Sequence, residues 1–375
     1  MTIVLFIVVL VALIVVHEFG HFIVAKLSGM RVDEFGIGYP PRAWGFKKGE
    51  TEYTLNWLPF GGFVRIYGED EQDRVEGTKD LARAFGSRPR LQQALVLLAG
   101  IVMNLAFAWV LLSATLFMGT LRALPAEKVA TTPDAHLAIT NVLPGSPAEK
   151  AGLKAGDIIL GARATVTTPS GASDFTGGDP DAFTALITAP VTETSWTLSL
   201  ERANGKNEDV SVTPERGIIK SDPGRPALGV SLASVAVLRT VWYKAPVEGA
   251  ALTWEVTKET ALGLIHFFGS IATFTADLTQ VSGPIGIAGA VGNASSHGLS
   301  ALLSLTAVIS INLALINVLP IPALDGGRLL FVFIEAIIRR PIPASVSRTV
   351  NTVGFGLLIL LMVVVSAHDI FKFFV

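Results

Sequence analysis

The chain has 375 residues, of which 50% are hydrophobic and only 16% are charged, and its formal net charge is −2. Soluble proteins of this length usually carry more charge, so the composition indicates an integral membrane protein with at least one water-soluble part. The near-neutral charge gives no indication of nucleic acid as a partner. The absence of cysteine excludes disulfides, iron–sulfur clusters and thiolate metal sites, so any metal must bind to histidines and carboxylates.

The first apolar run ends in titratable groups. Met1 to Val16 predicts a membrane helix, and His17-Glu18-Phe19-Gly20-His21 follows it directly. On a helix, His17 and His21 lie one turn apart and can reach one metal, while Glu18 can take a proton from a water molecule there. Ionisable groups inside a membrane span are costly and are rarely present without a use. A cleaved signal peptide and two metal-free interfacial histidines are the alternatives, but the run before His17 has no Lys or Arg.

Gly36 to Gly68, within the polar segment Arg31 to Arg90, predicts β structure. Tyr53 to Leu58 alternates loosely, Pro40-Pro41 and Lys48-Gly49 supply turns, and Pro59 to Gly62 breaks the far end. One interpretation is an ordinary cytoplasmic hairpin. Its aromatic content and its position after the histidines favour a hairpin that dips back toward them, which is allowed at membrane depth only where protein or water surrounds it.

Leu91 to Gly119 is the second predicted span, long enough to cross a hydrocarbon core of about 30 Å. Its one strongly polar interior residue is Asn104, for which we expect a hydrogen bond between helices.

Residues 121–235 have the composition of a water-soluble α+β domain. Pro144 to Leu160 closely resembles PDZ domains, whose groove binds extended peptides at an open sheet edge, so a peptide C-terminus is a possible partner. The elements expected around it are strands at Ile139 to Leu143, Trp196 to Arg202, Glu208 to Thr213 and Leu228 to Val230, helices from Pro147 and over Asp181 to Thr188, a flexible loop over Pro169 to Pro180, and a tight turn at Asn204-Gly205.

Residues 236–298 predict an amphipathic helix and a Gly-rich connection. Pro246 to Thr275 is apolar, yet Glu248, Glu255, Glu259 and His266 form one polar stripe on it. Such a helix lies in the membrane interface more naturally than it spans the bilayer. The connection is expected over Gly283 to Gly292.

Residues 299–375 hold the last two predicted spans, Leu299 to about Leu319 and Val350 to Ser366. Pro320 and Pro322 stop the first of these helices, and Asp325 lies just past its end. An interfacial turn or cap residue is the alternative interpretation of Asp325.

Loop charges predict how the spans are oriented. The loop between spans one and two and the loop between spans three and four should both be cytoplasmic, because they carry Arg83, Arg88, Arg90 and Arg328, Arg339, Arg340, Arg348. The PDZ-like domain and both termini then face outward. Sixteen residues place His17 about 24 Å below the outer surface, toward the cytoplasmic side. Spans one and three both run inward, so Asp325 can meet the histidines only if Pro246 to Thr275 does not cross.

The predicted fold is therefore a polytopic α-helical membrane protein with four transmembrane helices, a membrane-associated β hairpin and an extracytoplasmic α+β PDZ-like domain. The membrane core comprises residues 1–120 and 299–375, with the hairpin over residues 36–68.

The motifs His17-Glu18-x-x-His21 and Asn317-x-x-Pro320-x-x-x-x-Asp325-Gly326, together with the PDZ-like insert, resemble the site-2 proteases, intramembrane zinc metalloproteases, of the bacterial regulator-of-sigma-E type. The resemblance covers nearly the whole chain. It implies one zinc ion on His17, His21 and Asp325, with Glu18 as general base, and a membrane-entering hairpin within Gly36 to Gly68. The chain departs from the family at Ile101, where many relatives have proline, at Arg328, where histidine is frequent, and in having a single PDZ-like domain.

The resemblance implies cleavage of single-pass membrane proteins, such as anti-sigma factors or remnant signal peptides, in a bacterial inner membrane with the active site toward the cytoplasm. We expect the unwound substrate to pair with the hairpin edge and to contact substrate-binding residues at Asn312, Asn317, Pro320, Pro322, Gly61 and Gly62. For Asn312 and Asn317, a hydrogen bond between helices is the alternative interpretation. Two alternatives remain: a membrane PDZ scaffold with a vestigial metal site, and another membrane metallopeptidase that takes its carboxylate from a glutamate.

Overall fold

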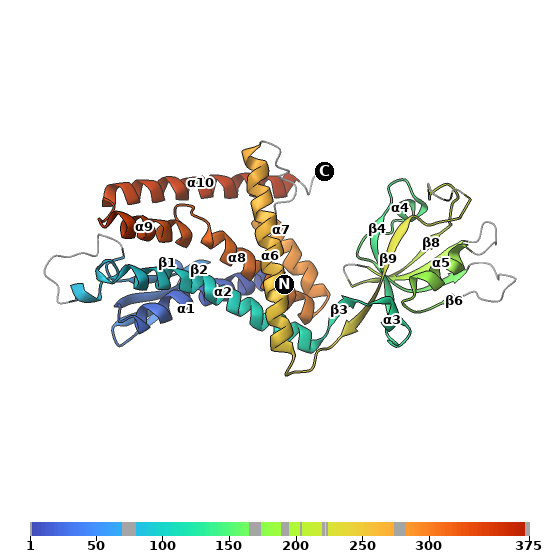
Figure 1. The fold of residues 1–375 in the computed structure, drawn as a ribbon, viewed down its shortest axis with the longest axis horizontal. Helices are drawn as coiled ribbons and strands as arrows, with labels where there is room; N and C mark the ends of the chain where they lie inside the picture. Colours follow the sequence, from blue (N-terminus) through green and yellow to red (C-terminus); the bar gives the residue numbers. More distant parts are fainter. Residues whose placement is uncertain are drawn as a thin grey trace. The chain divides into compact units, whose positions relative to one another are not determined.

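The computed structural model describes residues 2–69, 80–164, 174–188, 195–202, 205–219, 222, 224–273 and 283–371. The chain divides into two compact units, one formed by Met1–Ala114, Tyr243–Gly292 and Leu302–Val375, the other by Thr115–Trp242 and Asn293–Ala301. The first is mainly helical and the second is built on a sheet, as the labelled ribbon in Figure 1 shows.

Four helices in the described ranges are long and apolar enough to cross a membrane. They are α1 (Thr2–Leu27), α2 (Arg90–Met118), α8 (Leu299–Val318) and residues 345–367 of α10 (Ala344–Phe371). The four predicted spans are confirmed in number and in position. The helix expected at the interface is α6 (Ala245–Ala272). It is not among the described helices that are long and apolar enough to cross a membrane. Its place at the membrane surface stays a prediction.

Three of these helices pack together through two hydrophobic clusters in the helical unit. Val9 and Leu13 of α1 pack with residues of α8, and Ala108 and Leu112 of α2 pack against Ile311 of α8. α1 ends where Gly29 takes the left-handed conformation at φ 70°. The N–H of Met30 then donates to the Ala25 carbonyl at 2.9 Å, which closes the helix in the manner typical of a glycine C-terminus.

The segment after α1 is an antiparallel hairpin of β1 (Val32–Lys48) and β2 (Thr51–Ile66), which confirms the predicted β structure and begins slightly earlier than expected. Phe35 pairs with Tyr53 on one side and with Val64 on the other. The long strands therefore bend, and the end of β2 from Gly62 to Ile66 is an outer edge that no other described strand pairs with. The hairpin thus offers an unpaired edge next to α1.

An ion-pair cluster ties the hairpin turn to the helices. Glu50, in the turn between β1 and β2, accepts hydrogen bonds from Lys26 at the end of α1, at 2.7 Å, and from Arg83, at 2.7 and 2.8 Å. Arg83 lies in a short 3-10 helix, Leu81–Arg83, and a second one follows at Phe85–Ser87. The hairpin is therefore fixed at its base by charge as well as by packing.

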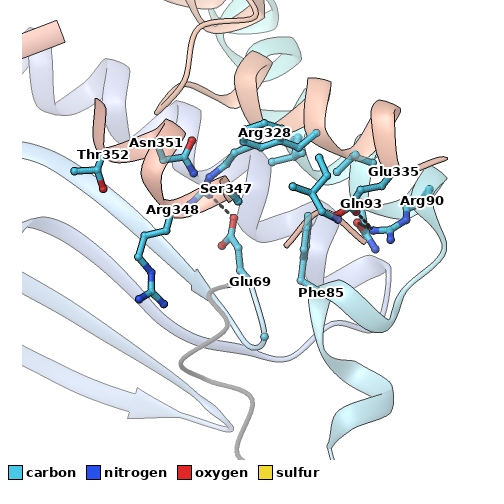
Figure 2. A pocket seen from close by; sticks show the side chains of 16 residues that line it. Glu69, Phe85, Arg90, Gln93, Arg328, Glu335, Ser347, Arg348, Asn351 and Thr352 are labelled. Carbon is cyan, nitrogen blue, oxygen red and sulfur yellow. Dashed lines mark hydrogen bonds and ion pairs between the residues drawn. The ribbon is translucent and has the colours of Figure 1, made fainter. Parts of the chain in front are cut away.

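α9 (Asp325–Ile338) follows α8 and, with α2 and α10, borders a cavity of about 480 Å³. Figure 2 shows its polar lining, in which Glu69 forms an ion pair with Arg328 of α9. Arg90 pairs with Glu335 at 2.6 Å on another wall. No helix was predicted here from the sequence.

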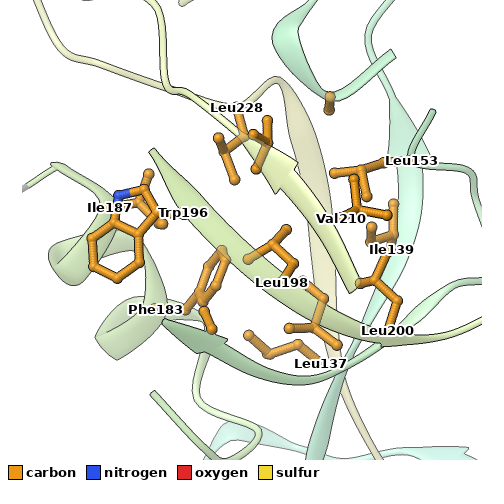
Figure 3. Packing of buried hydrophobic residues seen from close by; sticks show 14 of the residues in the cluster. Leu137, Ile139, Leu153, Phe183, Ile187, Trp196, Leu198, Leu200, Val210 and Leu228 are labelled. Atoms are coloured by element: carbon orange, nitrogen blue, oxygen red, sulfur yellow. The ribbon is translucent and has the colours of Figure 1, made fainter. Parts of the chain in front are cut away.

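The second unit is a seven-stranded antiparallel sheet. Its strands are β3 (Thr120–Ala123), β4 (His136–Val142), β5 (Ile158–Ala164), β6 (Asp174–Phe175), β7 (Trp196–Glu201), β8 (Asn207–Val212) and β9 (Val230–Leu238). In the sheet they lie in the order β3-β9-β4-β5-β7-β8, and β6 pairs with β5. Three short helices accompany them: α3 (Ala126–Val129), α4 (Pro147–Lys150) and α5 (Pro180–Thr188). Leu137, Leu198 and Leu200 are fully buried with Phe183 of α5 over the sheet (Figure 3). The strands and helices expected here are present, although the last strand begins at Val230 and not at Leu228.

Four expectations need correction. β1 continues through Pro40-Pro41, where a turn was expected, because the register shifts between Tyr39 and Arg42 and neither proline has a ladder partner among the described residues. β2 likewise continues through Pro59 to Gly62, where a break was expected. The connection expected over Gly283 to Gly292 is a helix, α7 (Pro284–Ser296), because Ile287 and Val291 pack against Val9 and Leu13 of α1 and this burial offsets the poor helix propensity of glycine. The loop expected over Pro169 to Pro180 contains the short strand β6, and part of it lies outside the described residues. Asn204 of the expected turn also lies outside them.

Candidate metal centre

Three side chains from the two ends of the chain converge within the helical unit. Nε2 of His17 and Nε2 of His21 lie 3.0 and 3.2 Å from Oδ2 of Asp325, and 3.2 Å from each other. One ligand atom from each residue can be chosen so that all three lie within 4.8 Å of one another. Both histidines are 8% exposed, so water has little access to their rings. The arrangement predicted from the sequence is confirmed.

The donor set fits a zinc ion. Oδ2 of Asp325 is buried and accepts no hydrogen bond, although two ring nitrogens lie beside it. Nδ1–H of His21 donates to the Val96 carbonyl at 2.8 Å, which leaves its Nε2 with a lone pair. Two imidazoles and one carboxylate are ligands that zinc prefers, and three protein ligands leave a fourth position open, as in catalytic zinc sites.

Two glycines allow the helices to bring the histidines against α2. A Cβ on Gly20 would overlap the carbonyl of Ala99, so α1 and α2 touch backbone to backbone at this point. A Cβ on Gly100 would lie 2.7 Å from Cε1 of His17 and would overlap Nε2 of His21. Since real Cβ atoms essentially never come within 3.0 Å of another atom, these positions must be glycine for the rings to stand as they do.

Asp325 is placed by a tight return of the chain after α8. It is the first residue of α9, where a carboxylate is favoured by the helix dipole. Gly326 and Gly327 follow, both buried, and a side chain on either would overlap backbone carbonyls at the end of α8 or at Ile321. The two glycines let α9 start directly against the preceding segment, which brings the carboxylate to the histidines.

Glu18 lines a cavity of about 400 Å³ with His21 and Asp325. Tyr39 of β1 and residues 63–66 of β2 also line it, so the hairpin edge and two of the three metal ligands border the same cavity. Gly62 lies against α1, because a Cβ there would be 2.8 Å from Ile14 and 3.3 Å from Cγ of Glu18. The hairpin reaches the site, as its aromatic content and position indicated.

The larger polar cavity adjoins this one. Both are lined by Glu69, Leu97 and Arg328, and the ion pair of Glu69 with Arg328 stands in their shared wall (Figure 2). Arg328 is one of the positions at which the sequence departs from the family that it resembles. The contact gives that arginine a structural role at the border of the site.

The remaining predicted substrate positions are spread around the site. Gly61 lies beside Tyr39, which lines the cavity, whereas Asn312 donates to the Val308 carbonyl of its own helix at 3.0 Å. Asn317 is buried, and Pro322 packs against Gly354 of α10. Within the described part of the chain, the cavity around Glu18 is not lined by Asn312, Asn317, Pro322 or the exposed Pro320.

Gly100 and Asn104 were not predicted to belong to the site. Nδ2 of Asn104 lies 3.1 Å from Nδ1 of His17, so the hydrogen bond expected between helices forms with a metal ligand. A signal existed, because the two residues are four apart and lie on one face of the second span, like the two histidines on the first. Which helix that face meets depends on tertiary packing.

Comparisons with known proteins agree with this geometry. The model for peptidase family M50 matches residues 5–361. A putative zinc metalloprotease of Clostridium perfringens is 35% identical over 96% of this chain and 95% of its own length. A putative zinc metalloprotease of Synechocystis is 32% identical over 96% of this chain and 92% of its own length. The regulator of sigma-W protease RasP of Bacillus subtilis is 29% identical over 100% of this chain and 99% of its own length.

The family match, the full-length similarity and the His17, His21 and Asp325 group converge on one assignment. The protein is a multi-pass membrane zinc metalloprotease, and the chain belongs to peptidase family M50, the site-2 proteases.

Proposed function

We propose that the protein hydrolyses peptide bonds within the transmembrane segments of single-pass membrane proteins. The observation that carries this proposal is the placement of the zinc ligands. They come from transmembrane helix α1 and from the first residue of α9, and they lie beside Glu18 and an unpaired strand edge. A scaffold would need neither the edge nor a carboxylate that is not a ligand.

Glu18 is proposed as the general base. Zinc bound to the three ligands supplies a Lewis acid that polarises the scissile carbonyl and makes a water molecule more acidic. Glu18 takes a proton from the water molecule while the water oxygen forms a bond to the carbonyl carbon. Glu18 then passes that proton to the amine nitrogen as the C–N bond breaks. The cavity of about 400 Å³ at Glu18 has room for water and for an extended segment.

A helical substrate must unwind before it can be cut, because its peptide bonds are shielded by their own hydrogen bonds. The freed N–H and C=O groups then need partners. We infer that the substrate pairs as an added strand with the edge from Gly62 to Ile66, because residues 63–66 line the same cavity as His21 and Asp325. Asn312, Asn317, Pro320, Pro322 and Gly61 remain candidate contacts for the rest of the substrate.

The proposed substrates include anti-sigma-factor-like proteins and remnant signal peptides. The name of the Bacillus subtilis relative, a regulator of sigma-W protease, supports the first class. We propose a bacterial inner membrane location with the metal centre toward the cytoplasm and the sheet unit outside, on the basis of the loop arginines. The sheet unit would exclude bulky ectodomains or bind a peptide C-terminus.

The test of this function replaces Glu18 with Gln in the full chain and follows cleavage of a single-pass reporter in vesicles. Cleavage should fall at least about 100-fold while zinc stays bound, because only the proton acceptor is lost. Glu255→Gln removes an exposed carboxylate of α6 and serves as the matched control, with cleavage unchanged. Normal cleavage by Glu18→Gln with zinc bound would exclude Glu18 as the base.

Pairing at the edge is tested by crosslinking. Single cysteines introduced at Val64 of β2 and, as the control, at Thr51 in the inner part of the hairpin are combined with cysteines along the reporter in the Glu18→Gln background. We expect crosslinks at Val64 with every second reporter residue, because a paired strand alternates its side chains. The absence of crosslinks at Val64 would count against strand addition.

A further inference from the structure

We propose that Asn104 is a positioning residue for the zinc site. Its amide oxygen accepts a hydrogen bond from Nδ1–H of His17, which keeps the lone pair of Nε2 directed at the metal. This inference rests on the proposed ligand role of His17 and adds to the site a residue from the second span, so that α2 contributes to metal binding without a ligand of its own.

The geometry brings the two side chains into direct contact. Asn104 is 0% exposed, and its amide group lies 3.1 Å from Nδ1 of His17 on the neighbouring helix. Its Oδ1 is buried and has no hydrogen-bond partner in the described structure. A buried amide oxygen without a donor is costly, so this oxygen is available for one.

The chemistry of imidazole decides which end of the amide must face the ring. A neutral histidine has one N–H and one lone pair, and a ring that binds zinc through Nε2 carries its proton on Nδ1. The partner of Nδ1 must then be an acceptor. Rotating the Asn104 amide by a half turn about its last side-chain bond exchanges nitrogen and oxygen, with almost no change in shape. That rotation brings Oδ1 to Nδ1 of His17.

The second histidine follows the same rule with a different acceptor. Nδ1 of His21 faces the carbonyl of Val96, eight residues before Asn104 on α2. Both ligands thus direct Nδ1 toward the same helix, with Gly100 between them. His21 meets a backbone carbonyl, whereas His17 lies one turn away and meets a side chain instead.

Asn104 is itself held in place from the opposite side. The hydroxyl of Ser310 on α8 donates to the backbone carbonyl of Asn104 at 2.8 Å, and Ser310 is fully buried. The asparagine therefore links α1 with α8, the helix that leads to Asp325. A hydrogen bond from Asn104 to Nδ1 of His17 fixes the orientation of the His17 ring. Loss of such a partner of a metal ligand typically lowers metal affinity about 10- to 100-fold.

The test measures zinc affinity in the solubilised full chain by competition with a chelator. Asn104→Leu keeps the approximate size and removes the acceptor, so the affinity should fall about 10- to 100-fold. Asn104→Asp replaces the amide with a carboxylate, which accepts hydrogen bonds but cannot donate them. The zinc affinity of this variant should equal or exceed that of the wild type. Thr306→Val removes a buried hydroxyl that bonds only its own helix, at Leu302, and should leave the affinity unchanged.

Each outcome separates this inference from the site assignment. His17→Ala should abolish tight zinc binding; if it does not, the ligand assignment itself fails. If His17→Ala loses zinc while Asn104→Leu binds it like the wild type, only the role of Asn104 is refuted. If Asn104→Asp loses as much zinc affinity as Asn104→Leu, the proposed role of Asn104 as a hydrogen-bond acceptor is refuted. Thermal unfolding of the zinc-free variants identifies any that lose affinity only because they are unfolded.

Discussion

Replacing Gly100 with alanine should damage the metal site while leaving α2 intact. The added Cβ would lie 2.7 Å from Cε1 of His17 and 2.8 Å from Cε1 of His21, whereas ordinary contact begins at 3.4 Å. The His17 ring must therefore move by about 0.7 Å, and the His21 ring, whose Nε2 would be closer still to the added Cβ, must move farther, since packed backbones yield little. A misplacement of about 1 Å near reacting groups can cost about 100-fold in rate. We expect zinc affinity and cleavage both to fall, by about 10- to 100-fold.

Chelator competition and reporter cleavage measure the two effects, and Gly356→Ala on α10 is the control. Nothing lies within 4 Å of a Cβ at Gly356, so its affinity and activity should not change. Alanine is the better helix former by about 1 kcal/mol in water, so neither variant should lose helix content. Wild-type zinc affinity in Gly100→Ala would show that the histidines do not depend on the close approach of α2.

Three further outcomes follow from other contacts. Hydrogen bonds to Glu50 from Arg83, and to a smaller extent from Lys26, lower the pKa of Glu50 to about 2. An unfolded glutamate titrates near about 4.3, so this stabilisation is complete above that pH and is lost as the pH falls toward 2; the melting temperature of zinc-free wild type should therefore drop more over this range than that of Glu50→Gln. Gly62→Val should lower cleavage but not zinc affinity, because its side chain would press on Glu18 and not on a ligand. Leu198→Ala should destabilise the sheet unit by about 2–5 kcal/mol, seen as faster limited proteolysis of that unit, because Leu198 is fully buried.

The elements that sequence reasoning identified are those governed by local geometry. His17 and His21 could be paired because helical spacing puts residues four apart on one face. Asp325 required a count of the spans and their directions, and the count of four was confirmed. Gly-rich α7 was missed because propensity argued against a helix there, while the burial of Val291 against α1 decided the outcome.

What the sequence could not predict depends on how helices meet. Asn104 reads as a polar residue in an apolar span, and nothing local identifies His17 as its partner. That contact requires the approach of Gly20 to the backbone of Ala99, which sets α1 against α2. The ion pair of Glu69 with Arg328 likewise joins residues that are far apart in the chain. Such pairings arise from tertiary packing, and the spacing of residues within a motif does not encode them.

The separation of the metal ligands along the chain has a consequence for biosynthesis. The two histidines lie on α1, whereas the aspartate is residue 325. Until that residue is made, the nascent chain holds two of the three ligands, and its hairpin can fold next to an incomplete metal centre. The centre is completed only when the segment that follows α8 packs against α1, so the hydrolysis that we propose must wait for that step.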